Sequence, residues 1–168
     1  MTVYIFSILC LLLLSAFFSA TETAFTSLNR IKMKNMANDD VKNAKLVLKL
    51  EDRYDKLLST ILIGNNIANI GMTAIATVMF VALLGGSLGP TASTVVMTVA
   101  VLIFGEISPK NIAKEHPEGF ALFAAPVMRG LMWLFTPLNV FFSLWKKLLG
   151  KLFGTQENGS YTEDELIT

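Results

Sequence analysis

The middle of the chain decides its fold. Residues 57–105 read LLSTILIGNNIANIGMTAIATVMFVALLGGSLGPTASTVVMTVAVLIFG and contain no Asp, Glu, Lys, Arg or His. The residues that follow are Glu106-Ile107-Ser108-Pro109-Lys110. A charge-free run of this length indicates membrane-spanning helices, because about 20 apolar residues cross the hydrocarbon core of a bilayer. A carboxylate directly after such a run stands where an ionisable group is costly, so Glu106 is the first candidate for function.

The composition of the whole chain agrees with a membrane domain. The 168 residues are 53% apolar, and the formal net charge of +1 gives no electrostatic argument for nucleic-acid binding. The single cysteine, Cys10, lies in an apolar run, which excludes a disulfide framework and a cysteine metal cluster. We therefore expect one all-α membrane domain over residues 1–154. Residues 155–168 are expected to be a linker and the start of a truncated cytoplasmic region.

Three transmembrane helices are expected. The first lies within residues 3–25, the second covers 57–84, and the third continues from 91–104 into the Glu106 region. The Gly and Pro residues of 85–90 predict a turn between the second and third helices. A cleaved signal peptide is the alternative for the first apolar run, but no Lys or Arg precedes that run.

The charges between the first two expected spans predict the orientation of the chain. By the positive-inside rule this segment is cytoplasmic, so the N-terminus lies outside and the C-terminus in the cytoplasm of a multi-pass protein of the cell membrane. Apolar residues also recur at helical spacing on both sides of 38–40, which predicts two short cytoplasmic helices. The eight basic residues are Arg30, Lys32, Lys34, Lys42, Lys45, Lys49, Arg53 and Lys56.

Residues 120–149 are apolar enough to be taken for a fourth span, but we expect an amphipathic juxtamembrane helix. A fourth crossing would place the basic end of the segment outside, against the charge bias. A fourth span kinked at Pro126 and Pro137 stays the alternative. The polar residues of the segment lie close to one helical stripe: Arg129, Thr136, Asn139, Ser143 and Lys147.

The first expected span carries polar residues on one helical face. Ser15, Ser19 and Glu22 are spaced i, i+4, i+7, which gathers two hydroxyls and a carboxylate in its cytoplasmic half. Alanines lie beside them, so a seam of small residues for close helix packing is the alternative interpretation of the serines.

The second expected span has a glycine followed by amides. Asn65 and Asn69 are one turn apart and share a face, directly after Gly64. Hydrogen bonding between helices is one explanation of these amides. Gly64 also lets another group approach the backbone closely, or frees a carbonyl from the helix ladder.

In the third expected span, Pro109 predicts a distortion beside Glu106. Proline has no amide hydrogen and disturbs the carbonyl of Gly105 four residues earlier, so the helix must kink or widen there. A carboxylate next to such a carbonyl suits a hard cation. An ion pair between Glu106 and Lys110, one turn apart, is the structural alternative.

The candidate ligands from the three spans are all oxygens: hydroxyls, amides, backbone carbonyls and one carboxylate. This chemistry matches Mg²⁺ or another hard cation, whereas softer metals require thiolate or imidazole. The candidate metal ligands are Ser15, Ser19, Gly64, Asn65, Asn69, Gly105 and Glu106.

On these motifs the chain resembles the transmembrane (DUF21) domain of the CorB/CorC and CNNM magnesium transporters. The motifs are SAFFSATETA at 15–24, GNNIAN at 64–69 and GEISPK at 105–110. The resemblance implies a homodimer of three-span protomers in membrane lipid, a belt-like juxtamembrane helix, a cytoplasm-facing Mg²⁺ site in each protomer and export driven by inward Na⁺. The resemblance implies that the first ligands are Ser19, Asn65 and Glu106. Ser15 and Asn69 come next, and Gly64 or Gly105 would bind through carbonyls. Pro109 would distort the helix so that the site can form.

The resemblance also sets the wider expectations. Full-length members continue into a pair of CBS modules that bind ATP. Animal members have Asn where this chain has Glu22, so Glu22 is not expected to be an essential ligand.

We expect a transporter domain and not an enzyme: no Ser/His or paired Asp arrangement appears, and His116 follows the third span in a loop-like context. The alternatives are a membrane Mg²⁺ sensor that does not move the ion, and an intramembrane hydrolase.

Overall fold

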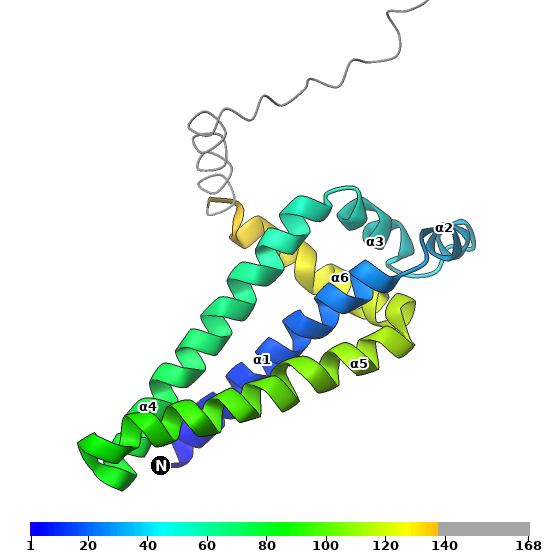
Figure 1. Ribbon diagram of the computed structural model, residues 1–168. Helices are drawn as coiled ribbons and strands as arrows, with labels where there is room; N and C mark the ends of the chain where they lie inside the picture. Colours follow the sequence, from blue (N-terminus) through cyan, green and yellow to red (C-terminus); the bar gives the residue numbers. More distant parts are fainter. Residues whose placement is uncertain (138–168) are drawn as a thin grey trace, which may run out of the picture. The chain divides into compact units, whose positions relative to one another are not determined.

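A computed structural model describes residues 1–137, and within that range the chain is all-α, which confirms the predicted fold class. The described residues form no strand. The elements, shown in Figure 1, are α1 (Thr2–Ser27), α2 (Arg30–Asn38), α3 (Ala44–Glu51), α4 (Tyr54–Ala100), the π-helix η1 (Val101–Ile107), α5 (Ser108–Glu115) and α6 (Pro117–Leu134). The predicted domain boundary at 154 lies outside the described residues.

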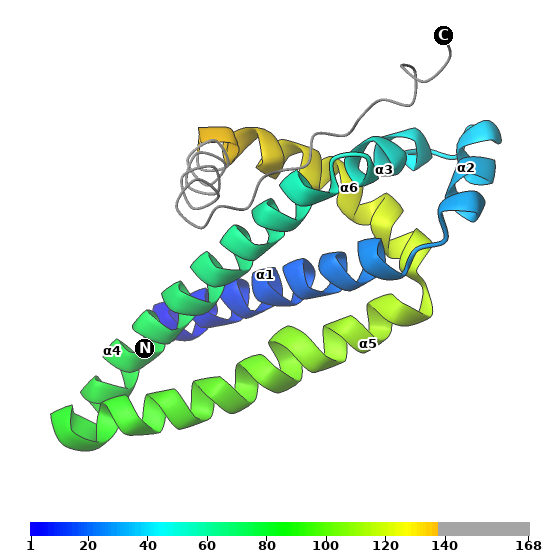
Figure 2. The same ribbon diagram turned by 45° about the horizontal axis from the view of Figure 1, so that its top comes forward.

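Two helical runs are long and apolar enough to cross a membrane: α1, and the continuous run Tyr54–Glu115 that joins α4, η1 and α5. The second run folds back at Gly85, the one residue of α4 with non-helical dihedrals (φ 84°, ψ 170°). Figures 1 and 2 show the resulting hairpin, with a first arm (54–84) that runs antiparallel to α1 and a second arm (86–115) that returns beside it.

The predicted turn at 85–90 is therefore in the right place but is shorter than expected. Helical geometry resumes directly after Gly85, so Pro90 lies inside the helix. A Cβ on Gly89 would lie 2.6 Å from the Cα of Val81, so the missing side chain lets the two arms meet closely at the hairpin end.

We predict that Gly85→Ala destabilises the domain by about 1–3 kcal/mol, because the backbone conformation at Gly85 is open essentially to glycine alone. A thermal unfolding curve in detergent measures the loss. Gly86→Ala is the matched control: Gly86 is helical, and nothing lies within 4 Å of an added Cβ. Equal midpoints for Gly85→Ala and the unaltered protein would contradict the role given to this residue.

The two short helices expected on either side of 38–40 are present as α2 and α3. With α6 they cover one end of the long helices, and together they bury a hydrophobic cluster. Asn43 is the N-cap residue directly before α3 and lies in the left-handed region at φ 67°. Its side-chain Nδ2 donates a hydrogen bond to the carbonyl of Leu122, 3.0 Å away. The members that α6 contributes to the cluster are Ala121, Ala124, Ala125, Met128 and Met132.

The described part of 120–149 is helical. α6 begins at Pro117 and contains Pro126, and it buries a face of alanines and methionines. It leaves Arg129 exposed, but Phe123 and Trp133 are exposed as well, so its outer side is not mainly polar. Figure 2 shows α6 crossing near the end of α1 and beside α3. Of the described helices, α6 is not among those apolar enough to span a membrane. Asn139, Ser143, Trp145 and Lys147 lie outside the described residues.

Glu118 ties the start of α6 to α2. Its carboxylate accepts hydrogen bonds from Lys32 Nζ at 3.0 Å and from the backbone N–H of Asn29 at 3.2 Å. Burial acts to raise the pKa of Glu118, but these hydrogen bonds outweigh it and leave the pKa below its ordinary value of 4.5. The ion pair therefore stabilises the fold most fully above that ordinary value.

This shift predicts a pH dependence. Because the folded pKa lies below the unfolded one, the contribution of Glu118 is present above pH 4.5 and is lost as the pH falls through the folded pKa. We expect Glu118→Gln to lower stability at pH 7 by about 0.5–1 kcal/mol and to flatten the acid limb of a thermal-midpoint profile. Lys34→Met, which removes an exposed lysine of the same helix, is the control. An unchanged acid limb in Glu118→Gln would contradict the assignment.

Candidate functional site

The candidate site lies where α1, the first arm of α4 and η1 meet. Ser15 of α1 donates its hydroxyl to Asn65 Oδ1 of α4 at 2.9 Å. The same Ser15 Oγ lies 3.2 Å from the place where a Cβ on Gly105 of η1 would stand. Ser15 is fully buried. Ser15 therefore contacts both Asn65 of α4 and Gly105 of η1.

Gly64 contributes close packing to this junction. A Cβ at Gly64 would lie 2.6 Å from Cε1 and Cε2 of the Phe18 ring, with Cζ nearer still. Phe18 is itself only 1% exposed, so the ring is held against the bare backbone of α4. This contact sets how closely α1 approaches α4, and it thereby brings Ser15 within reach of Asn65. The sequence analysis had considered Gly64 only for its backbone and did not identify Phe18.

Two candidate ligands are buried without a hydrogen-bond partner in the described part of the chain: Ser19 Oγ and Asn69 Oδ1. Leaving a buried polar atom unsatisfied costs about 1–3 kcal/mol, so such atoms call for an explanation. A bound cation or an ordered water at each atom would satisfy it. These two atoms are the strongest indication of a ligand in the domain.

Ser19 and Asn69 lie on opposite sides of the Ser15–Asn65 pair. α1 and the first arm are antiparallel, so one helical turn beyond Ser15 leads toward α6, whereas one turn beyond Asn65 leads toward Gly85. Each step is about 6 Å along a helix axis. The prediction that Ser19 and Asn69 share one small coordination sphere therefore does not follow from this arrangement.

The helix widens at the position that Pro109 predicted. η1 is a π-helix, and the N–H of Ser108 bonds to the carbonyl of Ile103, five residues earlier. Glu106 lies within η1 next to the buried Gly105, and its side chain is partly buried. Glu106 therefore directly follows the residue of η1 that lies against Ser15.

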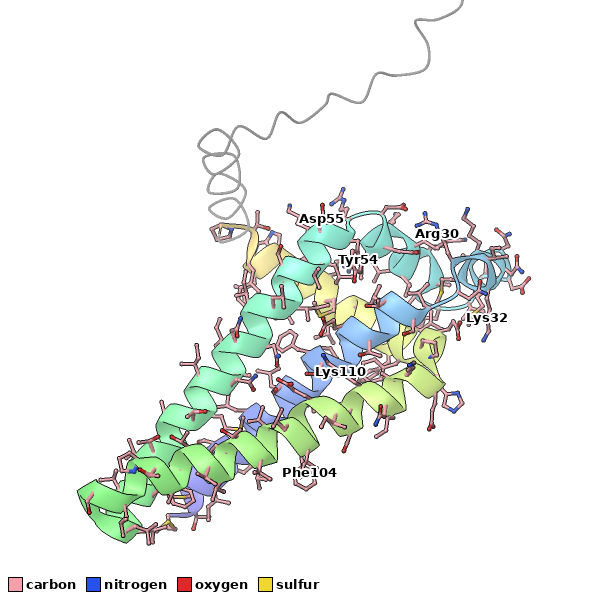
Figure 3. All side chains as sticks on the ribbon, viewed as in Figure 1. Arg30, Lys32, Tyr54, Asp55, Phe104 and Lys110 are labelled. Carbon is pink, nitrogen blue, oxygen red and sulfur yellow. The ribbon has the colours of Figure 1, made fainter. Side chains whose placement is uncertain are left out.

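Lys110 does not pair with Glu106. Its Nζ lies 3.2 Å from Oε2 of Glu22, which links the second arm to α1 (Figure 3). The ion-pair alternative considered for Glu106 is therefore not the one observed. Within residues 1–137 no three His, Cys, Asp or Glu side chains come together.

The structure reveals a continuation of the site that the sequence analysis missed. Thr73 donates its hydroxyl to the carbonyl of Asn69, and Thr77 donates its own to the carbonyl of Thr73, both at 2.8 Å. Thr77 Oγ1 also lies 3.2 Å from the hydroxyl of the fully buried Ser93 on the second arm. The signal was present in the sequence, because Asn65, Asn69, Thr73 and Thr77 recur every four residues.

Comparison with known proteins identifies relatives along nearly the whole chain. A UPF0053 protein of Haemophilus influenzae is 38% identical over 153 residues, which cover 91% of this chain and 36% of the relative. The UPF0053 inner membrane protein YfjD of Escherichia coli is 35% identical over 159 residues, or 92% of this chain and 37% of YfjD. A protein of Haemophilus influenzae named polyamine export protein is 30% identical over 175 residues, or 95% and 40%.

The chain thus spans well under half the length of these relatives. The family model described as the Cyclin M transmembrane N-terminal domain (CNNM) matches residues 5–168. This match, the apolar helical runs and the inner-membrane relative together make the chain a membrane protein. The chain belongs to the family of Cyclin M transmembrane N-terminal domains.

Proposed function

We propose that this domain transports Mg²⁺ through the junction of α1, α4 and η1. The observation that carries the proposal is the pair of buried oxygens without a partner, Ser19 Oγ and Asn69 Oδ1, on either side of the Ser15–Asn65 hydrogen bond. Unpartnered oxygens on both sides of one hydrogen-bonded pair suit an ion that enters from one end and leaves by the other.

The donor set suits a hard divalent cation. Mg²⁺ takes six oxygens at about 2.0–2.1 Å and gives up its water reluctantly. A cation would exchange the Ser15–Asn65 hydrogen bond for two oxygen contacts, while Glu106 supplies the neutralising charge. Carbonyls of Gly64 or Gly105 complete the first shell. The π-helix supports this role, because it contains Glu106 directly after Gly105, whose Cβ position lies 3.2 Å from Ser15 Oγ.

The proposal includes the topology and assembly expected from the sequence. α1 and the two arms of the hairpin are the three spans, with the N-terminus outside and the basic α2–α3 segment in the cytoplasm. Two copies form a homodimer, a CBS pair follows in the full-length protein, and an inward Na⁺ gradient drives export by alternating access. The hairpin at Gly85 supports this topology, since it returns the chain to the side of α2 and α3.

Flux through purified full-length protein in proteoliposomes tests the proposal. An internal Mg²⁺ indicator should report transport that accelerates with an opposing Na⁺ gradient and is absent from empty liposomes. Saturable Mg²⁺ binding with no flux in either direction would overturn transport and leave a Mg²⁺ sensor.

Export of an organic polycation is a second candidate function. The observation that favours it is the ion pair between Lys110 Nζ and Glu22 Oε2, which shows a carboxylate beside the site that already accepts a primary ammonium. A relative is named polyamine export protein. Spermidine flux in the same proteoliposomes, without Mg²⁺ flux, would favour this candidate over the first.

A further inference from the structure

We propose that the outward half of the cation route is a stripe of hydroxyl oxygens on the first arm of α4, leading from Asn69 past Thr73 and Thr77 to Ser93. This inference rests on the proposed transport function and extends it beyond the junction described above. It assigns translocation roles to three residues outside the predicted ligand set.

The stripe borders the interior of the helix bundle. Thr73 and Thr77 are partly buried, and the residues directly before them, Met72 and Ala76, are completely buried. Ser93, which contacts Thr77, is also completely buried, whereas Ile70 and Val78 on the outer flank of the stripe are 70% and 55% exposed. Figures 1 and 2 show the two arms side by side from this level to the turn. The hydroxyls therefore follow the edge of the buried face from the junction toward Gly85, and at Thr77 they meet the buried Ser93 between the two arms.

The hydrogen bonds of the stripe leave its oxygens free to accept a cation. Each threonine gives its proton to the carbonyl four residues earlier, so its oxygen can still act as an acceptor. Since Thr77 donates to Thr73, Ser93 acts as the donor in the Thr77–Ser93 contact. Asn69 Oδ1, buried without a partner at the inner end of the stripe, is the independent sign of a ligand there.

The neutral oxygens of the stripe suit the passage of a cation more than its tight binding. Successive groups lie about 6 Å apart along the helix, a spacing that a partly hydrated cation bridges through its own water. Conduction requires several weak sites in place of one strong site, and the stripe contains no carboxylate. The strong site and its charge remain at Glu106.

An apolar cluster beside the stripe shuts the route in this conformation. Met72 and Ala76 pack with Met97 of the second arm, and side chains of α1 close over them. A cation can therefore follow the stripe only when α1 and the arms separate. The partly buried members of the cluster are Ile8, Leu11, Leu12, Phe80 and Val101.

A hydroxyl bonded to the carbonyl four residues earlier is also common in helices that conduct nothing. Thr94 makes this bond to Pro90 at 2.9 Å on the exposed face of the second arm. Thr94→Val is therefore a matched control, since it removes the same local bond without touching the stripe.

The test measures binding and flux separately in the full-length protein. Thr77→Val and Ser93→Ala, singly and together, should keep Mg²⁺ affinity by calorimetry within about twofold and reduce Mg²⁺ flux about tenfold, while Thr94→Val transports normally. Normal flux in the double variant Thr77→Val/Ser93→Ala would overturn the inference.

A second measurement does not depend on transport. In a Cys10→Ala background, Thr77→Cys should react with a membrane-impermeant methanethiosulfonate added from the outside when α1 and the arms separate, whereas Thr94→Cys, which faces lipid, should not. If the unaltered protein binds Mg²⁺ without flux, the proposed function fails, and the cysteine pattern still decides whether water reaches the stripe. An unreactive Thr77→Cys would overturn the route in either case.

Discussion

Glu106→Gln is expected to abolish high-affinity Mg²⁺ binding, with a loss of about 100-fold or more. The substitution keeps the shape of the side chain and removes the charge. Glu106 is the carboxylate closest in sequence to the junction, directly after Gly105, whereas the other nearby carboxylate, Glu22, is already paired with Lys110. Neutral hydroxyl and amide oxygens alone do not compensate for the dehydration of Mg²⁺. A 100-fold loss corresponds to about 2.8 kcal/mol of binding free energy.

Isothermal titration calorimetry of the purified protein measures this loss. Glu115→Gln is the control, because Glu115 ends the same helical run and is exposed. The thermal midpoint of Glu106→Gln without Mg²⁺ shows whether the fold survives. A folded Glu106→Gln variant with unchanged affinity would remove Glu106 from the ligand set.

Features that depend on local chemistry were predictable from the sequence. The charge-free run gives the long helices, the glycines at 85–90 give a turn, and Pro109 gives a widened helix because its missing amide acts within one turn. The length of that turn was not predictable. Only Gly85 in α4 leaves helical geometry, and Gly89 then lies against the backbone of Val81, a contact between the arms that no local pattern encodes.

The sequence predicted which candidate residues share a helical face, but it did not predict the depth at which the faces of different helices meet. Spacing of four residues places Ser15 with Ser19 and Asn65 with Asn69, since each pair lies on one helix. The depth at which the two helices meet depends on their antiparallel register. Because the helices run in opposite directions, Ser19 and Asn69 lie on opposite sides of the Ser15–Asn65 pair. Periodicity within one helix contains no information about this register.

The second large effect is expected for Gly64→Ala, which should destabilise the domain by about 1–3 kcal/mol. The added methyl group would overlap the Phe18 ring, whose Cε1 and Cε2 lie 2.6 Å from the Cβ position. The ring is also in edge contact with Phe17, with 5.7 Å between centroids, and is almost fully buried. Because the ring cannot move aside freely, α1 and α4 must separate, which stretches the Ser15–Asn65 hydrogen bond.

Gly71→Ala is the control, because Gly71 is a second glycine of the same arm that faces α1. Its Cβ would lie 3.6 Å from Leu11 Cδ1, an ordinary contact, so thermal unfolding in detergent should show little change or a small gain from the better helix propensity of alanine. If Gly64→Ala and Gly71→Ala shift the midpoint alike, the effect belongs to glycine in a helix and not to the Phe18 contact.

A second substitution at Phe18 separates steric overlap from a general loss of packing. Phe18→Leu alone should destabilise the domain because it leaves space beside Gly64. Combined with Gly64→Ala, the smaller side chain makes room for the methyl group, so the double variant should be more stable than the sum of the single losses by about 0.5–3 kcal/mol. Since Gly64 adjoins Asn65, the same double variant should regain Mg²⁺ affinity that Gly64→Ala loses. Additive losses, or rescue of stability without rescue of affinity, would show that helix spacing at Phe18 does not set the geometry of the cation site.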